Sequence, residues 1–252
     1  MKQFSIHRDR KFFSGFAAGA TIAVIVAIML GRRANPVDLS SEQGITDAFH
    51  RLYTVNRIQE TLGATRWLGV ATVQCPLDMW VLQEIIWETR PDVIVETGTF
   101  HGGSALYFAT VFDALGRGRV ITVDIEDQPD KPRHDRITYL LGSSVSDEIL
   151  ATVRDALRPS GKVMVFLDSD HRAGHVIKEL RLYSAFVSPG AYLVVSDTDL
   201  NGHPVVVPFQ PGPGPMEAVE EFLGENDAFQ PDRSREKYGL TFSPGAYLRR
   251  AK

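Results

Sequence analysis

Four carboxylates stand at the ends of short apolar runs that have the composition of buried strands. Glu96, Asp124, Asp168 and Asp197 close the runs DVIVE, RVITVD, VMVFLD and AYLVVSD. The carboxyl ends of parallel strands meet at one edge of a sheet, and this edge is where such sheets bind ligands. Carboxylates that meet there repel one another unless a cation or hydrogen-bond donors lie between them. The pattern therefore predicts a ligand site at this edge.

The turn after the first of these runs has a glycine pattern that favours one class of cofactor. It reads Glu96-Thr97-Gly98-Thr99-Phe100-His101-Gly102-Gly103-Ser104 and opens a predicted helix. Glycines permit a tight turn and a close approach of the backbone to a ligand. The pattern is E-x-G-x-x-x-G, whereas a dinucleotide site prefers G-x-G-x-x-G. It fits a loop that binds S-adenosylmethionine (SAM), with Glu96 accepting a hydrogen bond from the cofactor ammonium.

Two further strand ends complete the predicted cofactor site. Asp124 is expected to hold both ribose hydroxyls, as acids do in related nucleotide-binding folds, although by itself it is equally typical of a turn that ends a strand. Gly142-Ser143-Ser144 follows the third strand and is expected to line the adenine. The predicted cofactor-binding residues are Glu96, Gly98, Thr99, Gly102, Gly103, Ser104, Asp124, Gly142, Ser143, Ser144 and Asp168.

The acids of the fourth and fifth strands indicate a divalent cation. Asp168 lies in VFLDSDH and Asp197 in VVSDTD, on strands that are neighbours in a doubly wound sheet. Mg²⁺ needs few protein ligands, prefers oxygen and keeps several waters, so two converging carboxylates suit it. Such an ion would hold a substrate hydroxyl and lower its pKa. The predicted metal ligands are Asp168, Asp197, Ser196 and Thr198, with Asp170 and Asp199 as further candidates.

Two histidines are candidates for the base that accepts the hydroxyl proton. His171 follows Asp168 by three residues, and the unperturbed pKa of histidine is near neutrality; a helix-capping or surface role fits its position equally well. His203 in Asn201-Gly202-His203-Pro204 is the second candidate. The predicted catalytic residues are therefore Asp168, His171 and His203. The predicted reaction is in-line attack of the substrate oxygen on the sulfonium methyl, and the enzyme contributes mainly alignment.

Alternating strands and helices are needed to bring these side chains together, and the sequence predicts them. Strands are expected over 92–96, 119–124, 137–141, 163–168 and 191–197, and helices over 76–89, 104–115, 147–157, 175–186 and 215–224. At the C-terminus Tyr238–Phe242 and Ala246–Arg250 flank Ser243–Gly245 as in a hairpin,. The order predicts an α/β, Rossmann-like sandwich with a mostly parallel seven-stranded sheet and a C-terminal antiparallel hairpin.

The N-terminus has a different character. Phe12–Leu30 contains no charge and nearly reaches the roughly 20 residues that cross a bilayer. Arg8, Arg10 and Lys11 precede it, and Arg32 and Arg33 follow it. A cleaved signal peptide would normally have a shorter apolar region and a small-residue cleavage site, and a buried core helix would need a complementary partner. We expect a transmembrane or membrane-anchoring helix.

This contrast divides the chain into three parts. They are a membrane anchor over 1–33, a linker with an amphipathic helix around Thr46–Thr61 over 34–66, and a SAM-dependent methyltransferase domain over 67–252. The excess of basic residues before the anchor weakly favours a domain outside the cytoplasm. A cofactor made in the cytosol favours the cytoplasmic side, which is our expectation.

Composition excludes some partners. The net charge is -4 and the pI is about 6.0, whereas a nucleic-acid-binding domain usually has a basic excess. The one cysteine, Cys75, cannot form an intrachain disulfide and is interpreted as structural.

Several blocks of the sequence resemble the cephalosporin hydroxylase and rhamnosyl O-methyltransferase family from about Trp67 to the C-terminus. They are WLGVATVQCPLDMWVLQEIIWETRPDVIVETGTFHGGSAL, VFLDSDH, VVSDTDLNGHPV, GPGPMEAVEEFL and DRSREKYGLTFSPGAYLRR. The resemblance implies a class I methyltransferase fold, SAM, often Mg²⁺, and homo-oligomers. It places Glu96, Gly98 and Asp124 at cofactor positions, and Asp168 and Asp197 at magnesium positions.

The resemblance also has departures and extensions. The family often has Glu-Asp after the fifth strand, where this chain has Ser196-Asp197. The spacing of Asp168 and His171 is similar to that in catechol O-methyltransferase, which has a lysine at the histidine position. Rhamnosyl members methylate sugar hydroxyls on lipid-linked glycans, which would suit a membrane anchor.

Three functional hypotheses follow. The first is Mg²⁺-assisted O-methylation of a hydroxyl on a small molecule or glycolipid sugar. The second is a cephalosporin-hydroxylase-like tailoring protein, although no pair of histidines and a carboxylate has the spacing of an iron site. The third is a non-catalytic, membrane-tethered SAM-binding module, which Ser196 in place of glutamate keeps open.

Overall fold

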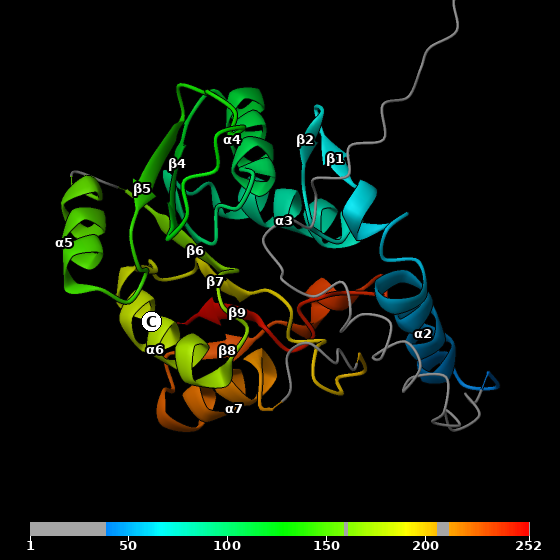
Figure 1. Ribbon diagram of the computed structural model, residues 1–252. Helices are drawn as coiled ribbons and strands as arrows, with labels where there is room; N and C mark the ends of the chain where they lie inside the picture. Colours follow the sequence, from blue (N-terminus) through cyan, green and yellow to red (C-terminus); the bar gives the residue numbers. More distant parts are fainter. Residues whose placement is uncertain (1–38, 159–160, 206–211, 252) are drawn as a thin grey trace, which may run out of the picture. The chain divides into compact units, whose positions relative to one another are not determined.

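The computed structural model describes residues 39–158, 161–205 and 212–251 (Figure 1). Spatial contacts divide the chain into two units, Met1–Val37 and Asp38–Lys252, and all the described residues belong to the second. The predicted membrane anchor at Phe12–Leu30 lies outside the described residues. Within the described part, every helix is too short or too polar to cross a bilayer.

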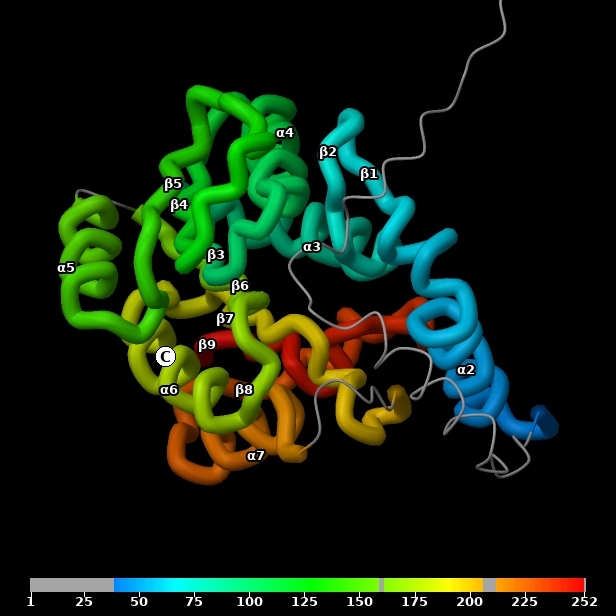
Figure 2. The backbone as a smooth tube through the Cα atoms, in the orientation of Figure 1, coloured from blue at the N-terminus to red at the C-terminus, as the bar shows by residue number. Residues whose placement is uncertain are grey.

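A seven-stranded sheet forms the centre of the second unit, in the order β5-β4-β3-β6-β7-β9-β8 (Figure 2). The pairings β3–β4, β3–β6, β4–β5 and β6–β7 are all parallel, and β9 runs antiparallel to both β7 and β8. The strands are β3 (Val93–Thr97), β4 (Arg119–Asp124), β5 (Ile137–Leu141), β6 (Val163–Leu167), β7 (Tyr192–Val195), β8 (Phe229–Pro231) and β9 (Tyr247–Arg250). The chain enters at β3, builds outward to β5, and then crosses to β6 on the other side of β3. Such a switch point is where doubly wound sheets bind ligands.

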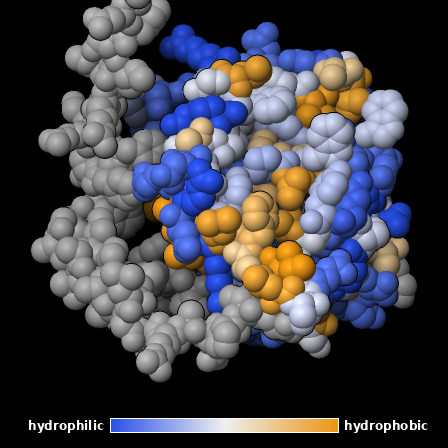
Figure 3. Space-filling model, turned by 90° about the vertical axis from the view of Figure 1, so that its right-hand side faces the viewer, coloured by the Kyte–Doolittle hydropathy of each residue, from blue (hydrophilic) through white to orange (hydrophobic). Residues whose placement is uncertain are grey.

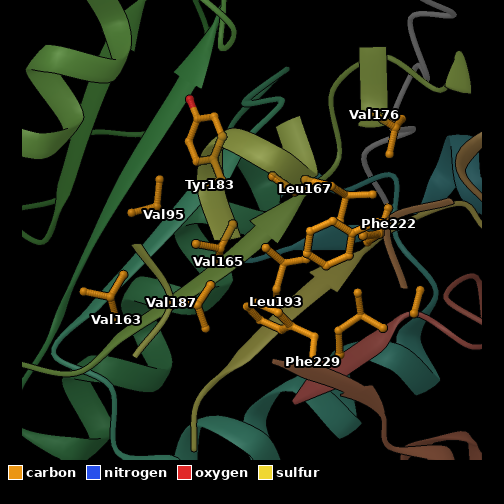
Figure 4. Packing of buried hydrophobic residues seen from close by; sticks show 14 of the residues in the cluster. Val95, Val163, Val165, Leu167, Val176, Tyr183, Val187, Leu193, Phe222 and Phe229 are labelled. Atoms are coloured by element: carbon orange, nitrogen blue, oxygen red, sulfur yellow. The ribbon is translucent and has the colours of Figure 1, made fainter. Parts of the chain in front are cut away.

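Five helices cover the two faces of the sheet. They are α3 (Pro76–Thr89), α4 (Gly103–Leu115), α5 (Asp147–Ala156), α6 (Ala173–Tyr183) and α7 (Pro215–Glu225). Side chains of α3 and α4 pack with Ile94 of β3, whereas side chains of α5, α6 and α7 pack with Val93 and Val95. Successive side chains of a strand point to opposite faces, so one strand serves both cores. Figure 4 shows the core beneath α5, α6 and α7, to which Val95 of β3, Leu193 of β7 and Phe222 of α7 contribute.

The predicted strands and helices of the body agree with these elements, but the C-terminal hairpin was predicted from the wrong segment. The partner of β9 is β8, with Phe229 opposite Arg250 and Pro231 opposite Leu248. Tyr238–Phe242 is not a strand, because Leu240 and Phe242 pack against Leu62 and Cys75 in a separate cluster. The apolar side chains of this segment are thus buried against residues that precede the sheet, and the segment does not pair with a strand.

The residues that precede the sheet form α2 (Glu42–Arg51), a π-helical turn (Leu52–Asn56), a 3₁₀ turn (Leu62–Ala64) and a small hairpin of β1 (Arg66–Trp67) and β2 (Val70–Ala71). The predicted helix at Thr46–Thr61 therefore starts earlier and ends earlier. Ser41 sets the start, because its hydroxyl accepts a hydrogen bond from the Gly44 amide at 3.1 Å, as an N-cap serine does. Two further 3₁₀ turns are Ser184–Phe186 and Arg233–Glu236.

Candidate active site

The first predicted acid, Glu96, is fully buried near the end of β3. Both carboxylate oxygens are closed off from solvent and make no hydrogen bond of good geometry among the described residues, although the hydroxyls of Ser104 and Thr122 lie near them. Burial raises the pKa of Glu96 to about 8 against the opposing effect of these two hydroxyls, and the carboxylates of Asp168 and Asp124 add to the rise. An unsatisfied buried carboxyl group costs free energy. Its position at the switch point fits a ligand that brings a cationic donor, such as the ammonium of SAM.

The glycines of the loop after β3 are required by contacts within the protein. A Cβ on Gly98, whose φ is +86°, would overlap the backbone carbonyl of Asp168. A Cβ on Gly103 would overlap the Ala71 carbonyl and the Thr72 hydroxyl. Gly102 caps α4 in the left-handed conformation, with φ at 76°. The loop therefore lies directly against the end of β6 on one side and the β2 segment on the other.

Asp124 ends β4 and is tied to the same loop. Its Oδ2 accepts a hydrogen bond from the Phe100 amide at 2.8 Å, and its Oδ1 accepts one from the Glu126 amide at 2.9 Å. Each carboxylate oxygen can accept more than one hydrogen bond, so both keep capacity for ribose hydroxyls. Thr99 is different, because its hydroxyl is buried and lies 2.6 Å from the Thr122 hydroxyl. Thr99 therefore fixes the loop to β4, and the structure gives it no free polar group.

The predicted adenine side, Gly142–Ser144, is fixed by helices α5 and α6. The left-handed Gly142 faces Ile149, which a Cβ would approach to 2.8 Å. The Ser143 carbonyl accepts a hydrogen bond from the Ser146 amide at 3.0 Å. The carbonyl of Ser144 accepts one from the Tyr183 hydroxyl at 2.8 Å, and its hydroxyl lies 3.2 Å from His175 Nε2. His175 and Tyr183 belong to α6, and the sequence analysis did not include them.

The second pair of acids converges as predicted, and His171 joins it. Asp168 directly follows β6 and Asp197 follows β7 by two residues, on strands paired through Leu167 and Val195. His171 Nε2 lies 3.1 Å from Asp197 Oδ2 and 3.6 Å from Asp168 Oδ1. One ligand atom from each of these three residues lies within 4.8 Å of the other two. This spacing suits a bound cation.

Electrostatics within this cluster are unbalanced. Burial raises the pKa of Asp168 to about 6, and the neighbouring Asp197 carboxylate adds to the shift. Burial alone would lower the pKa of His171, but Asp197 and Asp168 outweigh it and raise the pKa to about 9. Asp197 adopts a left-handed backbone, with φ at 60°, which is uncommon for a residue other than glycine. Strongly shifted pKa values and an uncommon backbone conformation are both typical of functional sites.

A glutamine that the sequence analysis missed holds one of these acids. Gln74 lies just before α3, is buried, and donates from Nε2 to Asp168 Oδ2 at 2.5 Å. The other oxygen, Oδ1, is the one that faces His171. The two residues are 94 positions apart, so no spacing rule could have linked them. The one feature of the sequence that points to Gln74 is its position inside the block WLGVATVQCPLDMW, which resembles the family.

Several other predicted residues do not join the cluster. Thr198 is fully buried and donates to the Pro244 carbonyl at 2.9 Å. Asp170 pairs with the Arg172 guanidinium, which lowers the pKa of its carboxyl to about 2. Asp199 is buried and faces His50 of α2, with 3.7 Å between Oδ2 and Nε2. Ser196 stays at the border, with its hydroxyl 3.5 Å from Asp197 Oδ1.

The second candidate base, His203, has a partner elsewhere. Its Nε2 lies 3.0 Å from Glu217 Oε1 on α7, and both side chains are partly exposed. The ion pair lowers the pKa of Glu217 against the opposing effect of its burial. The structure therefore brings His171, and not His203, to the two acids.

Comparison with known proteins gives concordant matches. A profile of the family described as Rhamnosyl O-methyltransferase/CmcI matches residues 59–251. A protein named rhamnosyl O-methyltransferase from Mycobacterium tuberculosis is 37% identical over 212 residues, which cover 81% of this chain and 84% of that protein. The protein of the same name from Mycobacterium leprae is 36% identical over 213 residues, which cover 81% of this chain and 90% of that protein.

Solved structures give the same fold. A structure of CmcI with Mg and SAM superposes with a TM-score of 0.58 at 21% identity, and covers 79% of this chain and 84% of that chain. The apo structure of CmcI gives the same values, a TM-score of 0.58 at 21% identity. The agreement supports the Rossmann-like sheet with C-terminal antiparallel strands.

Proposed function

The chain belongs to the Rhamnosyl O-methyltransferase/CmcI family and is thereby a SAM-dependent O-methyltransferase, and from this premise we propose that it methylates a hydroxyl of a lipid-carried sugar with the help of Mg²⁺. The observation that carries the proposal is the division of the strand-end acids into two sets. Glu96 and Asp124 lie around the glycine loop, whereas Asp168 and Asp197 converge on His171.

The first set supports the role of cofactor site. The buried carboxyl group of Glu96 would release its proton and accept hydrogen bonds from the SAM ammonium, whose positive charge would compensate the carboxylate,. Asp124 would hold the ribose hydroxyls with the lone pairs that the Phe100 and Glu126 amides leave free. The loop at Gly142–Ser144 would lie against the adenine.

The second set supports the role of metal and acceptor site. Asp168 and Asp197 would hold Mg²⁺, with Ser196 near enough to assist through its hydroxyl. Mg²⁺, when bound there, would stabilise the negative charge that develops on the acceptor oxygen. The positive charge of the ion would also offset the Asp168 and Asp197 carboxylates, which are what raise the pKa of His171. A neutral imidazole beside the acceptor could then take its proton.

The sugar acceptor and the membrane are supported by different observations. Relatives that are 36–37% identical over four-fifths of this chain carry the name rhamnosyl O-methyltransferase, which favours a sugar hydroxyl. The uncharged segment Phe12–Leu30 would anchor the chain to a membrane,. Because SAM is a cytosolic cofactor, the enzymatic unit would lie on the cytoplasmic side, close to lipid-borne acceptors.

The direct test is transfer of a labelled methyl group. The full-length protein would be incubated with methyl-labelled SAM and a rhamnose-bearing glycolipid, with Mg²⁺ or with EDTA. We expect label in an alkali-stable ether, loss of transfer in EDTA, and loss of transfer in Asp197→Asn. Asp170→Asn is the matched control, because Asp170 is also an acid at the end of β6 but is paired with Arg172.

Each contradictory result has its own meaning. Binding of SAM without transfer to any hydroxyl-bearing lipid would favour a non-catalytic module. Transfer that is indifferent to EDTA and to Asp197→Asn would remove the metal from the proposal. Equal losses in Asp197→Asn and Asp170→Asn would show that the cluster has no special role.

A further inference from the structure

Helix α2 and the turn that continues it expose a row of large apolar side chains to solvent. Ile45, Phe49 and Leu52 follow one another at spacings of four and three residues and are 54%, 47% and 42% exposed. His50 and Thr54, also four residues apart, are only 3% and 5% exposed. A helix on the surface of a globular protein normally buries its apolar face. Here Ile45, Phe49 and Leu52 stay exposed, although Tyr53 and Val55 of the following turn pack inward.

The buried polar face of α2 lies toward the active site. His50 Nε2 is 3.7 Å from Asp199 Oδ2, and Asp199 follows Asp197 of the cluster by two residues. Neither ring nitrogen of His50 makes a hydrogen bond of good geometry among the described residues, although the Thr241 backbone lies near enough to act on its pKa, and the Thr54 hydroxyl makes none either. Burial of these polar atoms costs free energy, while three large apolar side chains remain exposed on the outer side of the helix.

From these observations we propose that the face formed by Ile45, Phe49 and Leu52, here called the α2 face, lies in the headgroup region of a lipid bilayer. The proposal rests on the membrane anchorage proposed above. Figure 3 views the side of the molecule that carries α2 and shows apolar surface between hydrophilic areas. Helices that lie in the membrane interface have such an apolar face with basic residues beside it. Arg51 and Arg57 are exposed in the same segment of the chain, and side chains of this length can extend to lipid phosphates.

The length of the chain before α2 favours a bilayer as the occupant. The predicted anchor ends at Leu30 and α2 begins at Glu42. Residues 31–41 can span at most about 40 Å, because an extended chain advances about 3.5 Å per residue. The beginning of α2 is therefore held near the membrane surface, where even a weakly binding face would be occupied because of its high effective concentration.

A second copy of the chain is a poorer fit for the α2 face. Stable interfaces between proteins involve roughly 20–30 residues on each side. The α2 face offers three large apolar side chains on one short helix. Three such side chains are enough for an interfacial helix that is already tethered, since each buried CH₂ group contributes about 0.8 kcal/mol.

The proposal has a consequence for catalysis. With the α2 face in the interface, the opposite side of the helix would place Asp199 and the Asp168/Asp197 cluster just above the lipid headgroups. A sugar attached to a lipid could then reach His171 without leaving the membrane. A soluble acceptor would gain nothing from this arrangement.

Site-specific labels on the full-length protein test the proposal. Phe49→Cys and Leu52→Cys would each carry an environment-sensitive fluorophore, and the native Cys75 is fully buried and would not react. Leu182→Cys is the control, because Leu182 is also exposed on a helix but belongs to α6, on the other side of the molecule from α2 (Figure 2). The proteins would be reconstituted with vesicles of phosphatidylcholine and phosphatidylglycerol.

We expect the labels at positions 49 and 52 to shift to shorter emission wavelength in vesicles and to lose iodide quenching severalfold. The label at position 182 should remain as accessible to iodide as it is in detergent-free buffer. In parallel, the combined variant Ile45→Gln, Phe49→Gln, Leu52→Gln should keep its affinity for SAM and lose methylation of vesicle-embedded acceptor severalfold.

Three outcomes would overturn the proposal, and one of them also concerns the anchor. Protein that sediments with vesicles while all three labels stay equally aqueous refutes the α2 face alone. Protein that does not sediment with vesicles, with aqueous labels, refutes both the α2 face and the anchorage. Labels shielded without vesicles, together with a doubled molecular mass in solution, would assign the α2 face to a second copy.

Discussion

At the scale of single residues, the candidate site depends on how each buried carboxylate is compensated. Among the described residues, Glu96 has only the hydroxyls of Ser104 and Thr122 near it, Asp124 has two backbone amides, and Asp168 has the side-chain amide of Gln74. Carboxylates in such different surroundings have different pKa values and different ligand preferences. Glu96, to which no amide of the described residues donates, is suited to a cationic cofactor group. Asp168, which the Gln74 amide orients, is suited to a metal ion.

The first prediction concerns the pH dependence of stability of the cofactor-free protein in EDTA. Burial raises the pKa of Glu96 from 4.5 to about 8. The unfolded chain releases this proton above about pH 4.5 while the folded chain retains it until about pH 8, so the free energy of unfolding falls as pH rises through this window. Asp168 and His171, whose pKa values are also raised, contribute to the same fall, so Glu96→Gln should make the dependence shallower and, at pH 8, unfold at a higher denaturant concentration than wild type. It should also weaken SAM binding.

Chemical denaturation between pH 4.5 and pH 8.5 measures the effect. Glu126→Gln is the control, because Glu126 is exposed and should leave the pH profile unchanged. If wild type and Glu96→Gln lose stability in parallel as pH rises, Glu96 is ionised in the folded protein and the buried-acid interpretation is wrong.

The second prediction concerns Gln74. Its amide fixes Oδ2 of Asp168 and so leaves Oδ1 directed toward His171. Gln74→Met should weaken Mg²⁺ binding by about tenfold or more, the effect usual for residues that orient a metal ligand. Gln74→Glu should weaken it further, because a second carboxylate would repel Asp168. Calorimetry with Mg²⁺ measures this, and thermal unfolding checks that the fold is retained; unchanged Mg²⁺ affinity in both variants would contradict the role.

The sequence predicts the acids well and their supporting residues poorly. An acid that follows an apolar run marks the end of a strand in the sequence. The acids Glu96, Asp124, Asp168 and Asp197 could therefore be placed at the carboxyl edge of the sheet. Gln74 could not be found, because its contact with Asp168 depends on tertiary packing. His203 and Thr198 were placed near the cluster by their proximity in sequence, but the chain turns them toward Glu217 and Pro244.

At the scale of elements, the loop after β3 is positioned by two close backbone approaches. Gly98 lies against the Asp168 carbonyl, and Gly103 lies against Ala71 and Thr72. The first contact joins the loop after β3 to the end of β6 that carries Asp168, and the second joins α4 to the β1–β2 hairpin. Backbone packing therefore sets the spacing between the two sets of acids.

The third prediction tests this packing with two glycines of similar backbone conformation. Gly98 has φ +86° and Gly116 has φ +67°, but a Cβ on Gly116 would meet nothing within 4 Å. Gly116→Ala should cost about 1–2 kcal/mol, the usual cost of a left-handed residue other than glycine. Gly98→Ala should cost at least about 2 kcal/mol more, since overpacking displaces backbone. Equal losses in denaturant unfolding would contradict the close approach.

Most elements could be predicted because their periodicity is strong. The fully buried runs of β3 and β6 and the helix at Pro76–Thr89 are examples. The prediction of the C-terminal hairpin was wrong because Leu240 and Phe242 pack in a cluster with Leu62 and Cys75 and do not pair with β9. The spacing of apolar residues in the sequence predicts that a side chain is buried, but it does not predict which part of the chain covers it.

At the scale of the whole molecule, spatial contacts divide the chain into the units Met1–Val37 and Asp38–Lys252. The two cores that cover the sheet consist entirely of described residues after Asp38. The fourth prediction is that a chain lacking residues 1–37 keeps its unfolding transition and its affinity for SAM, but no longer sediments with vesicles. Flotation and calorimetry measure this; loss of SAM binding would show that the N-terminal segment contributes to the site.

The division of the strand-end acids into a cofactor set and a metal set is tested most directly by paired calorimetric titrations. Wild type, Asp124→Ala and Asp197→Asn would each be titrated with SAM and, separately, with Mg²⁺. We predict that Asp124→Ala weakens SAM binding by about tenfold or more, at least about 1.4 kcal/mol, and retains Mg²⁺ affinity, while Asp197→Asn does the reverse. Absence of SAM binding in wild type, or equal weakening of both ligands by both substitutions, would contradict the account.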